Sequence, residues 1–260
     1  MTKPDSSHSM LDPRTQTPSD LEYYSKIGDY FANSLGDNLD KLKNFSKFVP
    51  RQNLSLLIAK NEIFKNIIDV HGNIIECGVF LGGGLMTWAQ LSAIYEPYNH
   101  VRRVLGFDTF SGFPSMSKLD EPEAGAEIHH ARTGGLAVDG AEVDVRRAVE
   151  LFDLNRPIGH IPKVELVKGD ACQSIPDYVK KNDHLVVALL YLDFDLYEPT
   201  KMAIETFVPR MPKGSIIAFD ELNQKHWPGE TRAVLDTVGL RNLRIRRFPF
   251  TPQISYAILE

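Results

Sequence analysis

The chain of 260 residues is predicted to adopt an α/β fold, with a seven-stranded, mostly parallel sheet, helices on both faces and an antiparallel C-terminal hairpin strand. Three observations predict this fold. From residue 73 onward, apolar strand-like runs alternate with helix-like segments, the pattern of a parallel sheet covered by helices. Each of the five parallel strands carries an acidic residue at or near its carboxyl end, where sheets of this kind bind ligands. Hydrophobic residues make up 43% of the chain, enough for the core of one large domain.

The region before the sheet divides into two parts. Residues 1–20 are rich in Ser, Thr, Pro and Asp, which predicts a disordered tail. Residues 21–72 are predicted to form a helical extension or lid, because apolar residues recur at helical spacing from Leu21 to Phe48 and again over 54–70. Gly36 marks the expected break in the first stretch. Residues 73–260 are the main domain.

The main domain contains seven strand-like runs: 74–79, 103–108, 164–168, 185–193, 215–220, 243–248 and 253–258. Pro249 and Pro252 separate the last two, which we interpret as the antiparallel hairpin. Helices are expected over 84–95 and 141–154. The stretch 110–140 is irregular, and we expect it to form a mobile cover over the substrate, because loops of this length are usually functional or disordered.

Composition excludes several classes of protein. The net charge of −5 gives no general attraction for nucleic acid or an anionic membrane. No apolar run approaches the roughly 20 residues that span a bilayer, and the first 20 residues contain no apolar core of a signal peptide. Only Cys77 and Cys172 are present, so no disulfide framework or zinc site is indicated. We expect a cytoplasmic protein.

The turn after the first strand indicates a cofactor site. Glu76 lies two residues before Gly78, and Gly82 and Gly83 lead into the next helix. The spacing does not match a dinucleotide site, because Phe80 occupies the second glycine position, and the Lys and Ser or Thr of a phosphate loop are absent. Glu76 suits a cationic ligand group rather than a phosphate, which favours S-adenosylmethionine. The alternative is a strand-to-helix turn that binds nothing.

Two further strand ends carry candidate cofactor contacts. Asp108 begins the run Asp108, Thr109, Phe110, Ser111, and its carboxylate could accept both hydroxyls of a ribose. Gly169 and Asp170 are placed for the adenine, with Asp170 meeting the exocyclic amine. Capping of the helix that begins at Ala171 is an equal explanation for Asp170.

A carboxylate cluster is expected where the fourth and fifth strands end. Asp193 and Asp195 share one face of an extended chain, and Asp220 and Glu221 follow the neighbouring strand. Carboxylates this close need a compensating cation, so Asp193, Asp220 and Glu221 are predicted to bind Mg²⁺, with Ca²⁺ or Mn²⁺ next. A shared proton or a network with Lys or Arg is the alternative. Asp193 is the predicted base, and His226 competes with it, ahead of His129 and His130.

With these residues in place, the chain resembles the class I S-adenosylmethionine-dependent methyltransferases, and within them the macrocin O-methyltransferase family. The resemblance runs from about Phe48 to the C-terminus and is carried by three motifs: Glu76-Cys77-Gly78-Val79 with Gly82-Gly83, Gly106-Phe107-Asp108-Thr109-Phe110 with Gly112-Phe113-Pro114, and Leu192-Asp193-Phe194-Asp195-Leu196-Tyr197. It implies a Rossmann-like fold and Mg²⁺-dependent methylation of sugar hydroxyls in macrolide and aminocoumarin antibiotics.

The resemblance also implies residue roles. Asp193, Asp220 and Glu221 match the family's metal positions, and Asp193 also matches its base. Glu221 departs from the family pattern, which has a second aspartate there.

Other functions remain open from the sequence alone. They are a metal-independent O-methyltransferase that uses His226 on a phenol, a carboxylate or a phosphorus oxyacid, a non-catalytic S-adenosylmethionine-binding protein and, more distantly, a dehydrogenase. The acceptor is expected to be a small hydroxylated molecule such as a sugar or glycoside. The amphipathic helices before Phe48 suggest a homodimer.

Overall fold

The computed structural model describes residues 17–121 and 130–260. Its contacts divide the chain into two compact units, and the division falls between Leu54 and Ser55. This boundary lies earlier than the one expected between residues 72 and 73. The reason is that the helix over 51–65 buries Ala59, Ile63 and Phe64 in the core of the second unit.

The first unit is helical within its described residues. Helix α1 spans Pro18–Asn33, α2 spans Asn38–Lys43 and the short 3-10 helix η3 spans Phe45–Lys47. Helix α1 begins inside the stretch expected to be disordered, because Thr17 and Asp20 cap it reciprocally and Pro18 occupies its first turn. Gly36 separates the two helices at a φ of +96°, as the sequence predicted. The remainder of the predicted tail, residues 1–16, lies outside the described residues.

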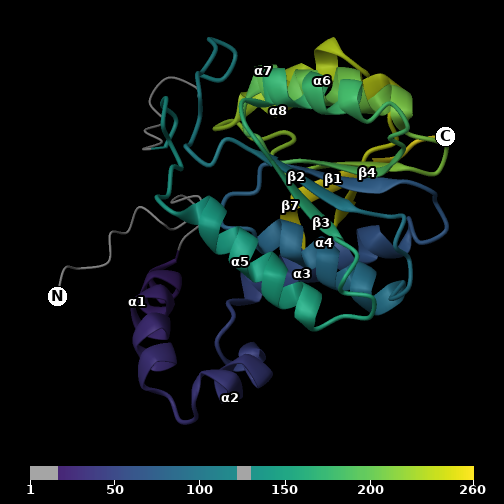
Figure 1. Ribbon diagram of the computed structural model, residues 1–260. Coiled ribbons are helices and arrows are strands. Elements are labelled where there is room, and N and C mark those ends of the chain that lie inside the picture. Colours follow the sequence, from purple (N-terminus) through teal and green to yellow (C-terminus); the bar gives the residue numbers. More distant parts are fainter. Residues whose placement is uncertain (1–16, 122–129) are drawn as a thin grey trace. The chain divides into compact units, whose positions relative to one another are not determined.

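The second unit contains the predicted mostly parallel sheet (Figure 1), in the order β3-β2-β1-β4-β5-β7-β6. The strands are β1 Asn73–Cys77, β2 Val104–Asp108, β3 Val164–Lys168, β4 Val187–Leu192, β5 Ile216–Phe219, β6 Arg246–Phe248 and β7 Thr251–Ile258. Strands β1 to β5 pair in parallel, whereas β7 pairs antiparallel with both β5 and β6. The strand order reverses between β1 and β4, and ligands of open α/β sheets bind at such a position.

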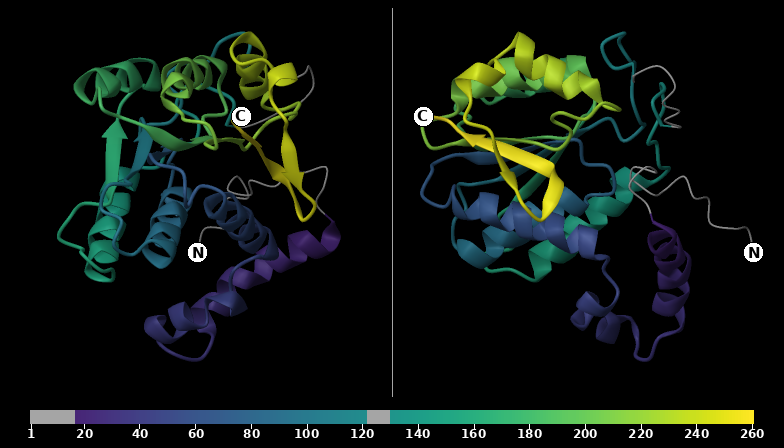
Figure 2. Two further views of the ribbon diagram at one scale, coloured as in Figure 1. Left: turned by 90° about the vertical axis from the view of Figure 1, so that its right-hand side faces the viewer. Right: turned by 180° about the vertical axis from the view of Figure 1, so that it is seen from behind.

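Helices cover both faces of this sheet, as Figure 2 shows from two further sides. Helices α3 (Arg51–Lys65), α4 (Gly83–Tyr95) and α5 (Ala141–Leu154) pack on one face, and α6 (Ala171–Lys181), α7 (Tyr197–Phe207) and α8 (Pro228–Asp236) pack on the other. The short 3-10 helix η4 (Val208–Arg210) follows α7, and the 3-10 helix η5 (Leu240–Asn242) follows α8. Because side chains alternate along a strand, Ile74 faces the first set of helices and Ile75 the second.

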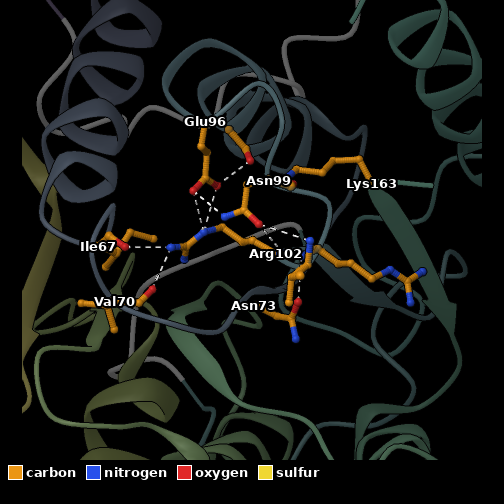
Figure 3. A network of polar contacts seen from close by, with 10 residues as sticks. Ile67, Val70, Asn73, Glu96, Asn99, Arg102 and Lys163 are labelled. Atoms are coloured by element: carbon orange, nitrogen blue, oxygen red, sulfur yellow. Dashed lines mark hydrogen bonds and ion pairs between the residues drawn. The ribbon is translucent and has the colours of Figure 1, made fainter. Parts of the chain in front are cut away.

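A buried polar network closes the amino ends of the strands (Figure 3). Arg102 is 3% exposed, and its Nη2 donates to the carbonyls of Ile67 and Val70 at 2.9 and 2.7 Å. Its Nε lies 2.8 Å from Glu96 Oε1, and Lys163 Nζ donates to the Asn99 carbonyl at 2.6 Å. The network joins the segments that enter β1, β2 and β3, at the opposite end of the strands from the predicted site.

In the part of the chain that the structure describes, no helix has both the length and the apolar character needed to cross a membrane.

Candidate active site

The glycine-rich turn connects β1 to α4, as the sequence predicted. Gly78 has a φ of +99°, and a Cβ at this position would lie 1.9 Å from the Asp193 carbonyl oxygen. Only glycine allows this approach, so the turn lies directly against the end of β4. Gly82 caps α4 in the left-handed conformation. A Cβ on Gly83 would meet nothing within 4 Å, so the first turn of α4 borders open space.

Glu76 is buried beneath this turn beside a lysine. Its Oε2 lies 3.5 Å from Lys60 Nζ of α3, and the two side chains are 2% and 8% exposed. Burial raises the pKa of Glu76, and the charge of Lys60 opposes that rise. Lys60 Nζ also lies 3.9 Å from the centre of the Tyr191 ring and 5.0 Å from that of Trp88. The sequence predicted a cationic ligand group beside Glu76, whereas the cation next to it here belongs to the chain itself.

Asp108 holds the turns after β1 and β2 together. Its Oδ2 accepts hydrogen bonds from the Val79 and Phe80 amides at 2.8 and 2.9 Å, and its Oδ1 accepts one from Phe110 at 2.6 Å. A carboxylate offers about four lone-pair positions, so one remains. This position is open to a ribose hydroxyl, and ribose binding by Asp108 stays a prediction.

The neighbouring predicted contacts lie in tight turns. Thr109 Oγ1 donates to the Gly112 carbonyl at 2.6 Å and accepts from the exposed Ser111 amide at 3.1 Å. Phe110 adopts a φ of +54° and packs against the core beneath α4 and α5. These contacts hold the loop after β2 at the carboxyl edge of the sheet.

Asp170 is the N-cap of α6, where its side chain accepts a hydrogen bond from the Cys172 amide at 2.9 Å. The capping alternative is therefore confirmed. Gly169 donates to the Asp108 carbonyl at 2.9 Å, which brings the ends of β2 and β3 together. Asp170 Oδ2 forms none of the hydrogen bonds found among the described residues, so capping leaves an adenine contact open.

Carboxyl groups gather where β4 and β5 end. Leu192 pairs with Phe219 in the sheet, so Asp193 and Asp220 leave neighbouring strands at the same level. Burial, followed by the charges of Asp220 and Asp195, raises the pKa of Asp193 well above its ordinary value. Burial and Asp220 raise the pKa of Asp195 to about 7, and burial with Asp220, Asp195 and Glu230 raises that of Glu221 to about 10. Asp220 therefore affects the titration of the other acids at this edge, and the convergence of Asp193, Asp220 and Glu221 on one point stays a prediction.

Three neighbours of the acids were not predicted from the sequence. Tyr191 donates to Asp220 Oδ1 at 2.6 Å, Glu230 Oε1 accepts from the Glu221 amide at 3.1 Å, and the charge of Lys60 opposes the pKa rise of both Asp193 and Asp220. Lys60 had a signal in the sequence, because it lies between Ala59 and Ile63 in the apolar stripe of its helix. Glu230 had none.

The chemistry of the acid cluster suits a hard cation, but its geometry does not yet form a complete site. Within residues 17–121 and 130–260, no three His, Cys, Asp or Glu side chains form a group that could hold a metal ion. The donors nevertheless consist of oxygen atoms, they repel one another, and Glu230 Oε2 is buried without a hydrogen-bond partner. A divalent cation would neutralise this repulsion.

His226 lies in the loop after β5, directly before Trp227. The Trp227 ring meets Phe113 of the loop after β2 edge-on, with centroids 5.7 Å apart. Both ring nitrogens of His226 are buried and have no hydrogen-bond partner among the described residues. A buried imidazole without a partner is the observation that keeps His226 as a candidate. His129, the weaker candidate, lies outside the described residues.

Solved structures show the same architecture. A structure of CalS11, described as a calicheamicin methyltransferase, matches with a TM-score of 0.89 and 34% identity over 95% of this chain and 96% of that chain. An apo structure of CalS11, described as a TDP-rhamnose 3'-O-methyltransferase of calicheamicin biosynthesis, matches with a TM-score of 0.81 and 32% identity, over 95% of this chain and 99% of that one. The O-methyltransferase NovP shares the fold, with a TM-score of 0.59 and 21% identity over 78% of each chain.

The sheet, the glycine turn and these relatives define the class: the chain is an S-adenosylmethionine-dependent O-methyltransferase. The profile of the macrocin O-methyltransferase (TylF) family matches residues 51–242. The chain belongs to that family, as the three motifs indicated. No curated protein sequence matches the chain.

Proposed function

We propose that this protein transfers a methyl group from S-adenosylmethionine to a hydroxyl of a sugar or glycosylated natural product, with the help of Mg²⁺. The observation that carries the proposal is the meeting of Asp193 and Asp220 at the carboxyl ends of adjacent strands, beside the glycine turn. The sugar acceptor is supported by the described activity of CalS11, which is 32% identical over nearly the whole chain.

The methyl donor is proposed to lie along the carboxyl edge of β1, β2 and β3. Open space beside Gly83 favours this placement, because the donor can reach the backbone of α4 there. The proposed contacts are Glu76, Gly78, Gly82, Gly83, Asp108, Thr109, Phe110, Ser111, Gly169, Asp170 and Asp193. Glu76 is paired with Lys60 beneath the turn. The remaining lone-pair position of Asp108 is proposed to accept a hydrogen bond from a ribose hydroxyl. The donor supplies an electrophilic methyl group on its sulfonium.

Asp193 is proposed as the base. It leaves β4 next to the turn that borders the donor, so its carboxylate lies near the position proposed for the methyl group. Its role is to take the proton from the acceptor hydroxyl as that oxygen attacks the methyl carbon; the bond from this carbon to the sulfonium sulfur breaks, and S-adenosylhomocysteine is released. The surrounding buried side chains exclude water from the transfer.

Asp193, Asp220 and Glu221 are proposed to hold Mg²⁺. When bound, the cation would lower the pKa of an acceptor hydroxyl and neutralise the clustered carboxylates. Glu221 is longer than the aspartate of the family pattern, so its side chain needs to adjust for ligation.

The test is a transfer assay with labelled S-adenosylmethionine and a panel of nucleoside-diphosphate sugars and glycosides. Each acceptor is assayed with Mg²⁺ and with EDTA. We expect turnover that requires the cation, and we expect Asp193→Asn to lower kcat by a factor of about 100 or more while binding of S-adenosylhomocysteine persists. Asp183→Asn, at a side chain that is 98% exposed, is the matched control. Full turnover by Asp193→Asn would contradict the assignment of the base.

A second candidate is metal-independent transfer with His226 as the base. The unpartnered ring nitrogens of His226 favour it. In that case EDTA leaves turnover unchanged, whereas His226→Gln removes it. The acceptor would then be a phenol, a carboxylate or a phosphorus oxyacid.

Homodimer formation through the helices before Phe48 stays a prediction, which light scattering of the purified chain would test. The cytoplasmic location also stays a prediction; Cys77 and Cys172 are both unpaired.

A further inference from the structure

Asp120 is a buried carboxylate that the chemistry proposed above does not use. It lies in the loop after β2 and is 1% exposed. Its Oδ2 accepts hydrogen bonds from the Ser117 amide at 2.7 Å and from Ser117 Oγ at 2.8 Å, and its own amide donates to the Ser117 carbonyl at 3.1 Å. These bonds close a tight turn from Ser117 to Asp120.

The other oxygen of Asp120 reaches a different loop. Oδ1 accepts a hydrogen bond from the Tyr197 amide at 2.6 Å, across 77 residues of sequence. Tyr197 is the first residue of α7, and Leu196 at the N-cap provides no side-chain cap. Asp120 therefore caps α7 from a distance, with its negative charge at the positive end of the helix.

The start of α8 packs closely against the hydrogen bond between Asp120 and Tyr197. A Cβ on Gly229, in the first turn of α8, would lie 2.4 Å from Asp120 Oδ1, 2.6 Å from the Tyr197 amide and 3.0 Å from the Asp195 carbonyl. The side chain of Arg232 also donates to the Leu119 carbonyl. Asp120 thus lies where the segments after β2, β4 and β5 meet.

These segments carry the acids of the site. Asp193 and Asp195 lie four and two residues before Tyr197. Asp195 has a φ of +63°, a left-handed conformation that is uncommon outside glycine but that aspartate adopts more readily than most residues. Glu230 follows Gly229 and accepts from the Glu221 amide. A shift in the hydrogen bond between Asp120 and the Tyr197 amide would therefore move the backbone that carries Asp193 and Asp195 and the backbone that carries Glu230.

We infer that Asp120 is a positioning residue for methyl transfer: it joins the loop after β2 to the starts of α7 and α8, and so fixes Asp193 relative to Glu221. The kinetic part of this inference rests on the proposed function. Asp120→Asn is the direct test, because an amide offers one acceptor atom where the carboxylate offers two. Whichever way it turns, its NH₂ group faces a backbone amide, that of Ser117 or that of Tyr197.

The experiment compares Asp120→Asn with Gly229→Ala, which disturbs the same contact from α8, and with Tyr197→Phe. The last variant keeps the Tyr197 amide and removes its hydroxyl, which donates to Asp236 Oδ2 at 2.8 Å and also interacts with Lys201. Hydrogen exchange is followed in peptides that cover residues 114–121 and 193–200. Kinetic assays give kcat and the affinity for S-adenosylhomocysteine. Ser117→Ala, a milder change, replaces Asp120→Asn if that variant fails to fold.

We expect faster exchange in both peptides for Asp120→Asn and Gly229→Ala, together with a kcat lower by a factor of about 10 to 100 and unchanged S-adenosylhomocysteine affinity. Tyr197→Phe should retain the exchange and kcat of the parent protein. The inference is overturned if exchange changes in only one peptide, or if kcat falls only in proportion to lost cofactor binding. If the parent protein methylates no acceptor, the proposed function fails, and the exchange data alone decide whether Asp120 joins the loops.

Discussion

Gly83 and Gly84 are adjacent residues in the first turn of α4. The structure predicts that replacement by alanine lowers the stability of the protein at Gly84 but not at Gly83. A Cβ on Gly84 would lie 1.9 Å from Glu76 Oε1 and 2.5 Å from Lys60 Nζ. Both atoms end long side chains, but both chains are buried, so they cannot turn out into water. A Cβ on Gly83 would meet nothing within 4 Å.

The magnitudes follow from this geometry. Alanine favours a helix over glycine by up to about 1 kcal/mol, a gain that both variants share. Overpacking at Gly84 costs about 1–3 kcal/mol, and separation of the buried Lys60–Glu76 pair adds to this cost. We therefore expect Gly84→Ala to lower the unfolding free energy by about 2 kcal/mol, which is a fall in Tm of about 4–8 °C for a chain of this size.

Thermal unfolding with and without S-adenosylhomocysteine measures both effects. Gly83→Ala should keep or raise the Tm of the ligand-free protein, but it should lose most of the rise in Tm that the ligand produces, because its methyl group occupies the space assigned to the donor. A Gly84→Ala Tm within about 2 °C of the parent would refute the packing argument. Full ligand stabilisation of Gly83→Ala would show that the donor lies elsewhere.

Two further predictions concern the amino ends of the strands. Arg102→Met leaves the Ile67 and Val70 carbonyls without their donor and removes the buried ion pair of Glu96, which keeps its hydrogen bonds from Ser92 and Asn99. It should lower the unfolding free energy by about 3–5 kcal/mol in urea titrations. Arg103→Met, at a partly exposed ion pair with Glu165, should cost less than about 1 kcal/mol. Burial lowers the pKa of Lys163 to about 8 from an unfolded value of 10.5, so between these pH values the unfolded chain binds more protons and stability rises with pH. From pH 7.5 to 10.5 the parent should therefore gain about 1–2 kcal/mol relative to Lys163→Met, after allowance for solvent screening, and an equal pH dependence of the two proteins would contradict the cause given for the shift.

Much of the fold follows from local patterns. The β3 strand and the α5 helix have the bounds that their apolar spacing predicted, and Gly36 marks the expected chain break. The neighbouring positions of β4 and β5 followed from the rule that sequential strands of such sheets pair. The same reasoning placed Asp193 and Asp220 together, because acids that end adjacent parallel strands share one edge.

The partners of individual side chains were less predictable. Asp108 is predicted to accept both hydroxyls of a ribose, and the structure adds partners that the sequence did not indicate: the amides of Val79, Phe80 and Phe110 donate to its carboxylate. These amides need acceptors in a turn where the strand ladder has ended, and the nearest carboxylate satisfies them. Residues 21–72 were expected to form one extension, yet the apolar face of α3 belongs to the core of the second unit.

The sequence alone determined the class of fold and the residue types at the carboxyl edge of the sheet, where the site is proposed, because hydrophobic periodicity and glycine positions are properties of neighbouring residues. Tertiary structure decided which distant groups meet at that edge: Lys60 beside Glu76, and Asp120 against the start of α7. Contacts between residues far apart in the chain depend on how whole elements pack, and packing selects among partners that local sequence leaves equivalent.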